Sequence, residues 1–265
     1  DNIHIWLQLI RKNEVINLRS QRLKINTKHI GRVGSFTEQI ARRNLIAFAA
    51  IGIYDSCPMA PWGGKEARLS TNPISWAAPR ADGDPIFMDG ATTVVAEGKI
   101  KVYMMQGKEV PLGWVKDNQG WDTTDPHDLY TNPRGTLYPL GGKTGGAKGS
   151  ALAIMTNLFS IALCNEDYWS APENRCTNSV FLMAVDPEFF CGREAYEKQV
   201  AAHCAYIKSS APADGFSEVL MPGEFEQKRL EKSRVEGCDI PDGTWESLLK
   251  LGEQLDCDWY KEYRN

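Results

Sequence analysis

The stretch APWGGKEARLSTNPISWAAPRADGDPIFMDGATTVVAEGK, residues 60–99, is the part of the chain that says most about its fold. It is rich in Pro and Gly and contains two short strand-like pieces, ISWAA at residues 74–78 and PIFMD at residues 85–89. Such composition is typical of backbone that turns sharply and approaches a ligand closely. The stretch therefore predicts short strands joined by tight turns beside a binding site.

The segments on either side of this stretch alternate between strand and helix patterns. Residues 45–53 form a continuous apolar run of strand length, and residues 179–185 read as another strand. Ser35 and Glu38 match a capping box that would open a helix ending near residue 43. Residues 91–103 fit either a helix or a strand, and residues 106–136 read as surface loops and turns. Further helices are predicted over residues 3–12, 149–164 (apolar nearly all round, hence buried), 188–208, 224–236 and 244–255. This alternation indicates an α/β protein.

Composition excludes several classes of function. The 265 residues carry a formal net charge of −4 and show no basic patch, which disfavours nucleic acid or an anionic membrane as a partner. No apolar run is long enough to span a bilayer, and no signal peptide is readable at the start. The seven widely spaced cysteines contain no CxxC pair, so we expect reduced thiols, a cytoplasmic protein and no metal site.

A glycine-rich segment, PLGGKTGGAKGSAL at residues 139–152, invites comparison with a P-loop. Gly142, Lys143 and Thr144 match the end of that motif. The glycine that the motif requires upstream is replaced by Leu137, and no strand leads cleanly into the segment. The sequence therefore disfavours nucleotide hydrolysis by a P-loop.

Taken together and in this order, residues 60–99, residues 139–152 and MPGEFEQKRLEK at residues 221–232 resemble the malate/L-lactate dehydrogenase type 2 family. The resemblance runs from about His29 to Leu255. It implies an NAD- or NADP-dependent oxidoreductase of small 2-hydroxy, 2-keto or cyclic imino acids that works as a homodimer. It also implies a non-Rossmann α/β fold, a layered sheet with helices like that of sulfolactate dehydrogenase. The absence of GxGxxG agrees with this fold.

The resemblance carries over a set of cofactor-binding residues from separate segments. The family places a His-x-Gly turn and the helix that follows it against the cofactor, and the backbone N–H groups near Ser35 would be free to bind an anion. The residues alone favour a solvated histidine in a helix-entry turn at His29, and the resemblance reverses that preference. In the family the glycine-rich segment forms a loop, and the ammonium of Lys148 reaches the cofactor phosphate. The predicted cofactor-binding residues are His29, Gly31, Asp89, Gly90, Ala91, Thr92, Thr93, Ala147, Lys148, Gly223, Glu224 and Phe225.

The family counterpart of the segment LSTNP contacts substrate, which makes Thr71 and Asn72 the predicted substrate-binding residues. A hydroxyl and an amide could hydrogen-bond a substrate carboxylate. Without the resemblance, Asn72 and Pro73 read as an ordinary turn.

The catalytic residue is not assigned by the resemblance. In the family it is the histidine of a Ser-His-Gly segment, which we expect upstream of Asp1. Residues 1–28 are then a remnant of an N-terminal helical region, and residues 29–265 an NAD(P)-binding α/β domain with C-terminal helices. Two hypotheses remain: an active dehydrogenase, or a catalytically impaired relative that binds a nucleotide or a partner. The choice between NAD and NADP, and the identity of the substrate acid, stay open.

Overall fold

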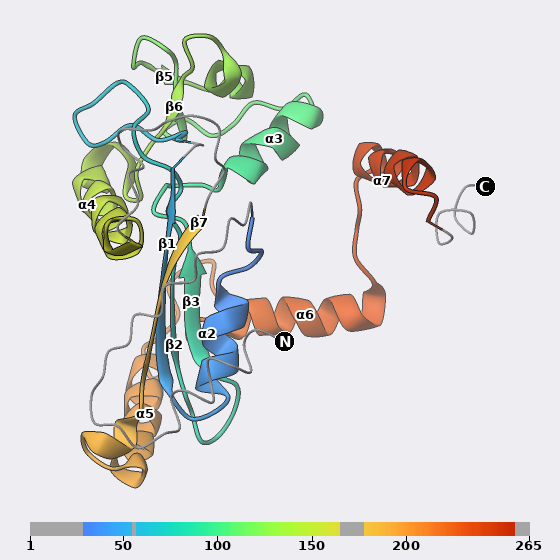
Figure 1. Cartoon of the computed structure of the whole chain (residues 1–265). Helices are drawn as coiled ribbons and strands as arrows, with labels where there is room; N and C mark the ends of the chain where they lie inside the picture. The colour runs from blue at the N-terminus through green and yellow to red at the C-terminus, as the bar shows by residue number, and fades with distance from the viewer. Residues whose placement is uncertain (1–28, 55–56, 165–177, 258–265) are drawn as a thin grey trace. The chain divides into compact units, whose positions relative to one another are not determined.

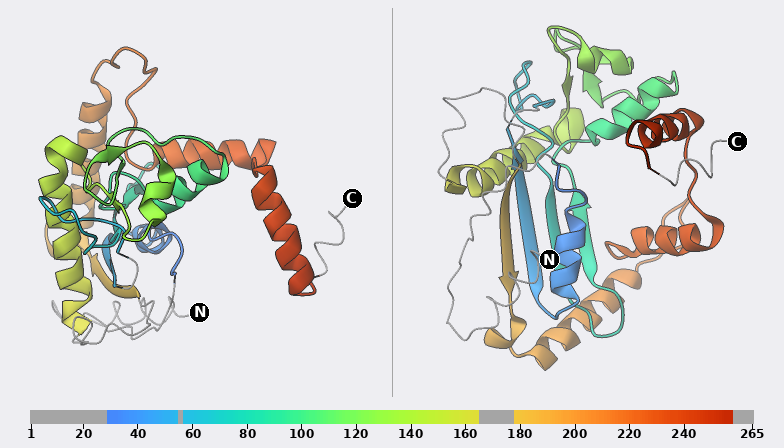
Figure 2. Two further views of the ribbon diagram at one scale, coloured as in Figure 1. Left: turned by 90° about the horizontal axis from the view of Figure 1, so that it is seen from above. Right: turned by 45° about the vertical axis from the view of Figure 1, so that its right-hand side comes forward.

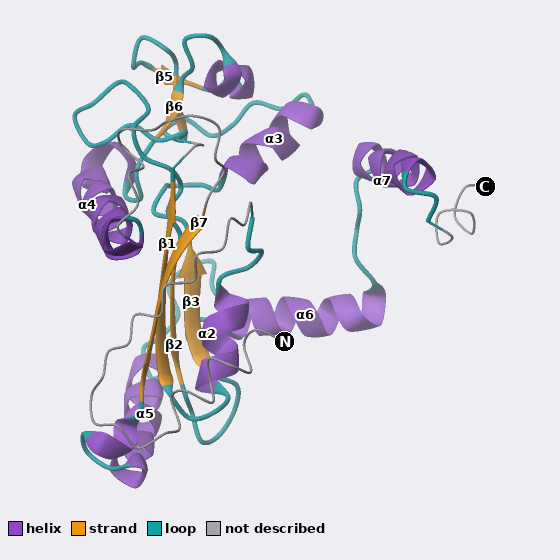
Figure 3. Cartoon of the chain, viewed as in Figure 1, coloured by secondary structure: helices purple, strands orange, loops and turns teal. Residues whose placement is uncertain are grey.

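The computed structural model describes residues 29–54, 57–164 and 178–257 (Figure 1). The chain divides into two compact units, the first ending at Gly223 and the second beginning at Glu224. The helices and strands of each unit are coloured in Figure 3. The predicted helix over residues 3–12 lies outside the described residues, and the predicted boundary after residue 28 stays a prediction.

The first unit is built on a four-stranded antiparallel sheet with the order β3-β2-β1-β7. All four strands were predicted from their apolar patterns, and the structure confirms each within a residue or two. Short turns rich in Pro and Gly join β2 to β3, as the composition of residues 79–85 predicts. The strands are β1 (Ile46–Ile53), β2 (Ile74–Ala78), β3 (Ile86–Gly90) and β7 (Asn178–Val185).

Helix α2 (Gly34–Ala41) covers one face of this sheet (Figure 2, right). Its buried side packs into a core with residues of β1, β2 and β3, including Ala47, Ala77 and Phe87. The predicted capping box is wrong, because the N-cap residue is Val33 and Ser35 is already helical. The Glu38 carboxylate instead bonds the Arg32 guanidinium at 2.5 Å.

Helix α4 (Gly142–Ser160) packs against β1 and β7 at one end of the sheet, on the side opposite α2 (Figure 1). Gly52 of β1 makes this approach possible, because a Cβ there would lie 2.3 Å from the Ser160 hydroxyl. The helix begins at Gly142, earlier than the predicted residue 149, and ends before a short 3-10 turn, Ala162–Cys164. The prediction that it is buried all round is wrong: five large apolar side chains on its outer face are exposed, Leu152, Ile154, Met155, Leu158 and Phe159.

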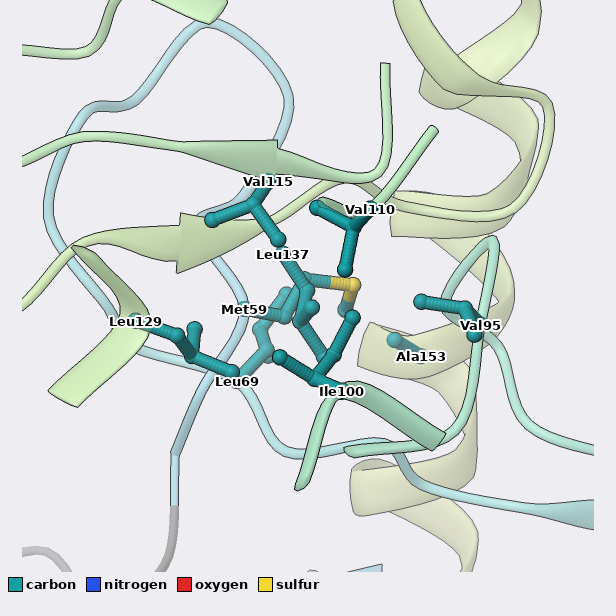
Figure 4. Close-up of a cluster of buried hydrophobic side chains, with 9 residues drawn as sticks. All are labelled: Met59, Leu69, Val95, Ile100, Val110, Val115, Leu129, Leu137 and Ala153. Atoms are coloured by element: carbon teal, nitrogen blue, oxygen red, sulfur yellow. The ribbon is translucent and has the colours of Figure 1, made fainter. Parts of the chain in front are cut away.

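A second core, whose side chains are drawn in Figure 4, lies among the elements beyond this end of the sheet (Figure 1). Residues 106–136, predicted as loops, contain β4 (Val115–Lys116), β5 (Asp122–Thr123) and a 3-10 helix, Pro126–Tyr130. Together with β6 (Thr136–Leu137) they make a small sheet of order β5-β4-β6. Helix α3 (Glu97–Met105) settles the open choice for residues 91–103 in favour of a helix that begins at Glu97. The core is formed by Met59, Leu69, Val95, Ile100, Val110, Val115, Leu129, Leu137 and Ala153.

Three further helices complete the described chain. After β7 comes a 3-10 turn, Pro187–Phe189, and then α5 (Arg193–Lys208), which starts later than the predicted residue 188. The second unit consists of α6 (Glu224–Glu236) and α7 (Asp242–Gln254), both close to their predicted bounds. None of the described helices combines the length and the apolar composition that a bilayer crossing requires.

Candidate functional site

The start of α2 is held by a carboxylate from β3. The Asp89 Oδ2 atom accepts a hydrogen bond of 2.7 Å from the backbone N–H of Gly34, and the Arg32 Nε atom lies 3.9 Å from the same oxygen. The next two N–H groups, of Ser35 and Phe36, bond the carbonyls of Arg32 and Val33. The expectation that these N–H groups are free for an anion is therefore wrong, because the chain's own carboxylate and turn carbonyls occupy them.

A buried hydroxyl pair fixes the same helix one turn further along. The Thr37 and Ser75 hydroxyl oxygens lie 2.6 Å apart, and both residues are fully buried. Ser75 is the cross-strand partner of Asp89, so the two polar contacts from the sheet to α2 stand side by side on β2 and β3. Together they set where the His29–Gly34 turn runs.

His29 and Gly31 form a local turn before α2. The His29 Nδ1 atom accepts a hydrogen bond of 3.0 Å from the Gly31 N–H. Since Nδ1 is an acceptor, the neutral ring carries its proton on Nε2, and within the described residues that nitrogen has no hydrogen-bond partner. Gly31 has a φ of +83°, and a Cβ there would meet nothing within 4 Å, which leaves open space beside the turn.

The Pro222–Gly223 turn lies against the edge of β3 at Phe87. The Phe87 N–H bonds the Pro222 carbonyl at 3.1 Å, and a Cβ on Gly223 would lie 2.6 Å from the Phe87 ring. The Arg32 guanidinium stacks on the same ring, 4.8 Å from its centroid. Three segments predicted from separate parts of the sequence, near His29, Asp89 and Gly223, thus come together. Glu224 and Phe225 open the second unit, and their cofactor contacts stay predictions.

Most polar groups of the other predicted segments are used inside the fold. Asn72 is completely buried, and its side-chain amide donates to the Ala153 carbonyl at 3.1 Å and accepts from the Ile53 N–H at 3.3 Å. The Thr92 hydroxyl bonds the carbonyls of Thr71 and Asn72, and the Thr93 hydroxyl bonds that of Val95. In the described chain the Thr71 hydroxyl has no hydrogen-bond partner, so it is the group of this set that is free to meet a substrate. Gly90 and Ala91, both half-buried, link this set to Asp89.

The predicted glycine loop is in fact the first turns of α4, and its glycines serve close packing. A Cβ on Gly146 would lie 2.8 Å from the Trp62 ring, and one on Gly149 would lie 2.3 Å from the Leu140 carbonyl oxygen. The Trp62 N–H also donates to the Ser150 hydroxyl at 3.0 Å. Ala147 and Lys148 lie on the exposed side of these turns, and the Lys148 ammonium has no ion pair within the described residues.

Beside α4 lies a cluster that the sequence did not predict, which we call the charged cluster. It is formed by Lys116, Asp122, Tyr138 and Lys143. Burial lowers the pKa of Lys116, although the charge of Asp122 acts in the opposite direction. Hydrogen bonds from Lys143 and Tyr138 lower the pKa of Asp122. Burial and the bond to Asp122 raise the pKa of Tyr138 to about 12. A lysine next to an apolar residue in a segment read as loop offers no signal of burial, so only the register of β4 and β5 reveals the cluster.

A sequence model of malate/L-lactate dehydrogenases matches residues 24–249. The chain belongs to the malate/L-lactate dehydrogenase family. This confirms the resemblance inferred from residues 60–99, 139–152 and 221–232. The antiparallel sheet with helices, together with the structural likeness described next, confirms the predicted non-Rossmann α/β fold.

Several relatives in this family are dehydrogenases of hydroxy acids. The chain is 33% identical over 232 residues to L-sulfolactate dehydrogenase of Methanocaldococcus jannaschii, covering 87% of this chain and 65% of the relative. It is 31% identical to (2R)-3-sulfolactate dehydrogenase (NADP(+)) of Chromohalobacter salexigens, covering 83% and 63%. It is 29% identical to ureidoglycolate dehydrogenase (NAD(+)) of Escherichia coli, covering 83% and 62%. The chain thus spans less than two thirds of the length of each of these relatives.

The likeness extends to three dimensions. A solved structure of sulfolactate dehydrogenase from Methanocaldococcus jannaschii matches with a TM-score of 0.72 at 31% identity, covering 92% of this chain and 68% of that one.

The charged cluster predicts how stability changes in acid. The folded pKa of Asp122 lies below its ordinary value of 3.8, so the ionised carboxylate stabilises the fold above that value. This stabilisation is lost as the pH falls through the folded pKa. We expect the difference in free energy of unfolding between wild type and Asp122→Asn to be constant near neutral pH and to shrink below about pH 4. Urea denaturation at a series of pH values measures it.

The matched control for this experiment is Asp84→Asn, at an exposed ion pair with Arg42. Exposed pairs contribute little, so its difference from wild type should be small at every pH. A difference for Asp122→Asn that stays the same from neutral to acid pH would contradict the assignment.

Proposed function

We propose that this protein is an NAD- or NADP-dependent oxidoreductase that transfers a hydride between nicotinamide and a small 2-hydroxy, 2-keto or cyclic imino acid. The observation that carries the proposal is membership of a family whose relatives are named dehydrogenases of such acids. A second support is that the segments near His29, Asp89 and Gly223, predicted to bind one cofactor, lie together in the fold.

Side chains on two of the predicted cofactor-binding segments, the first turns of α4 and the His29 turn, suit a nicotinamide dinucleotide. Lys148 offers an exposed ammonium without a carboxylate partner in the described chain, which is the kind of group that binds a phosphate. Gly31 leaves space beside the His29 ring, whose Nε2–H can donate to a polar group of a ligand. When bound, the nicotinamide ring would supply or accept the hydride. The chain's own residues would hold and orient the two reactants.

Thr71 is the residue that we propose to contact the substrate. Its carbonyl is held by the backbone N–H and the hydroxyl of Thr92, while its own hydroxyl has no hydrogen-bond partner among the residues that the structure describes. A fixed backbone with a free hydroxyl can donate a hydrogen bond to a carboxylate or a keto oxygen. Asn72, whose amide is bonded within the fold, would support this role by fixing the turn.

Relatives differ in the cofactor that their names record, NADP(+) for one and NAD(+) for another. Either cofactor is compatible with the proposal. We also propose that the protein is cytoplasmic, because its seven widely spaced cysteines without a CxxC pair suit reduced thiols.

Cofactor binding tests the proposal. NADH and NADPH are titrated separately, and binding is followed by energy transfer from tryptophan to nicotinamide. We expect saturable binding of at least one of them, and a loss of affinity of about tenfold in Lys148→Ala, the order of a charge-assisted contact.

Lys108→Ala, at another exposed lysine of the same unit, is the control and should bind like wild type. Absence of binding to either nucleotide would contradict the proposal. Binding without turnover of any 2-keto acid would favour the alternative, a relative that binds nucleotide and has lost catalysis.

We further propose that the protein forms a homodimer through the outer face of α4. Residues 149–164 contain no charged side chain, and the outer face of α4 exposes large apolar groups. This face continues onto the sheet, since Phe159 contacts Phe181 at a centroid distance of 5.5 Å and Phe48 lies 6.1 Å beyond it. Trp76, packed on Phe48, is 48% exposed. Apolar surface of this extent is typical of an interface.

A charge in this face should separate the subunits. We expect Met155→Glu to sediment as a monomer at concentrations where the wild-type chain is a dimer, because an unpaired carboxylate would be buried on association. Leu112→Glu, at a side chain that is 67% exposed in the loop before β4, should leave the dimer intact. A monomeric wild type, or a dimeric Met155→Glu, would contradict this interface.

A further inference from the structure

Lys116 is a buried cation in the small sheet. Lys116, on the central strand β4, is the cross-strand partner of Asp122 on β5 and of Thr136 on β6. The residue is 8% exposed, and its ammonium donates to the Gly64 carbonyl at 3.0 Å and lies 5.0 Å from the Tyr138 ring centroid. A buried ammonium is costly unless its charge and its protons are satisfied, so these partners account for its place.

Asp122, the carboxylate opposite Lys116, is bonded to the first turn of α4. It accepts a hydrogen bond from the Tyr138 hydroxyl, and its second oxygen accepts one of 2.8 Å from the Lys143 ammonium. Lys143 is the second residue of α4. The carboxylate therefore joins the small sheet to the beginning of this helix.

Gly64, the acceptor for Lys116, belongs to a turn whose Trp62 contacts α4 at Gly146 and Ser150. It closes a tight turn in which its N–H bonds the Pro61 carbonyl at 2.9 Å. Trp62 of that turn packs on Gly146 and donates its N–H to the Ser150 hydroxyl. The cation and the carboxylate thus hold α4 at two points that flank Ala147 and Lys148.

We propose that Lys116 and Asp122 are positioning residues for the cofactor site, which they serve by fixing the first two turns of α4 and hence the direction of Lys148. The inference rests on the proposed function for its cofactor. Neither residue need touch the nucleotide. Their effect on affinity passes through the Gly64 carbonyl and Lys143.

Two measurements test the inference on Lys116→Met, which removes the ammonium and keeps the apolar stem. The first is amide hydrogen exchange, expected to accelerate about tenfold or more at residues 62–64 and 143–148 while the four-stranded sheet is unchanged. The second is the dissociation constant for the nicotinamide cofactor, expected to rise about tenfold, because a displaced phosphate ligand loses much of its contact.

Val115→Ala is the matched control. Val115 is the neighbour of Lys116 on β4 and belongs to the buried apolar core, so its truncation destabilises the same region without touching the charged pair. We expect its unfolding midpoint to fall, while exchange at residues 62–64 and 143–148 accelerates much less than in Lys116→Met and its cofactor affinity stays like that of wild type. Equal changes in the two variants would overturn the positioning role and leave Lys116 a structural residue.

Lys143→Ala keeps the test decisive if Lys116→Met does not fold. The Lys143 side chain is 73% exposed, so its loss spares the core and cuts only the bond from Asp122 to α4. Exchange should then accelerate over residues 143–148, and unchanged exchange there would overturn the inference. A wild-type chain that binds no nicotinamide would refute the proposed function, whereas unchanged exchange would refute the fixing of α4 by Lys116 and Asp122, so the two failures are distinguishable.

Discussion

The hydrogen bond from the Gly34 N–H to the Asp89 carboxylate is the contact on which the arrangement of the first unit depends. It joins the start of α2 to the edge strand of the sheet and neutralises the positive end of the helix with the chain's own charge. Gly34 is required at this point because a Cβ there would lie 2.9 Å from the carboxylate oxygen. With α2 held, the His29 turn, Phe87 and the Pro222–Gly223 turn occupy neighbouring positions.

Close packing against glycines fixes the other predicted cofactor-binding segment, the first turns of α4. Gly146 and Gly149 let Trp62 and Leu140 approach α4, and Gly52 lets the same helix approach β1. The glycines that resemble a phosphate-binding loop are therefore packing residues, and the exposed groups between them, Ala147 and Lys148, are what remains for a ligand. Glycine occurs at these positions because the neighbouring segments lie too close to leave room for a side chain, and not because the segment is a flexible loop.

The four strands of the main sheet could be predicted from the sequence because apolar runs of strand length between Pro and Gly turns are a local signal. The start of α2 could not be predicted in this way. The backbone N–H of Gly34 bonds the carboxylate of Asp89, which is distant in sequence, and the helix begins before the local pair Ser35 and Glu38 could form a capping box. The burial of Lys116 was equally hidden, since it depends on the register of very short strands. The family resemblance indicated which segments of the chain contribute to the candidate site. It did not separate Thr71, whose hydroxyl has no partner in the described part of the chain, from Asn72, Thr92 and Thr93, whose polar groups are bonded within the fold.

Amide hydrogen exchange at Gly34, compared in wild type, Asp89→Asn and Asp89→Ala, tests the central role of this carboxylate most directly. An asparagine carbonyl can still accept the Gly34 N–H, whereas alanine cannot. We expect exchange at Gly34 to accelerate strongly in Asp89→Ala and much less in Asp89→Asn, with a loss of about 1–2 kcal/mol in free energy of unfolding for the alanine variant. Wild-type exchange and stability in Asp89→Ala would show that α2 is held by other contacts and would contradict the account.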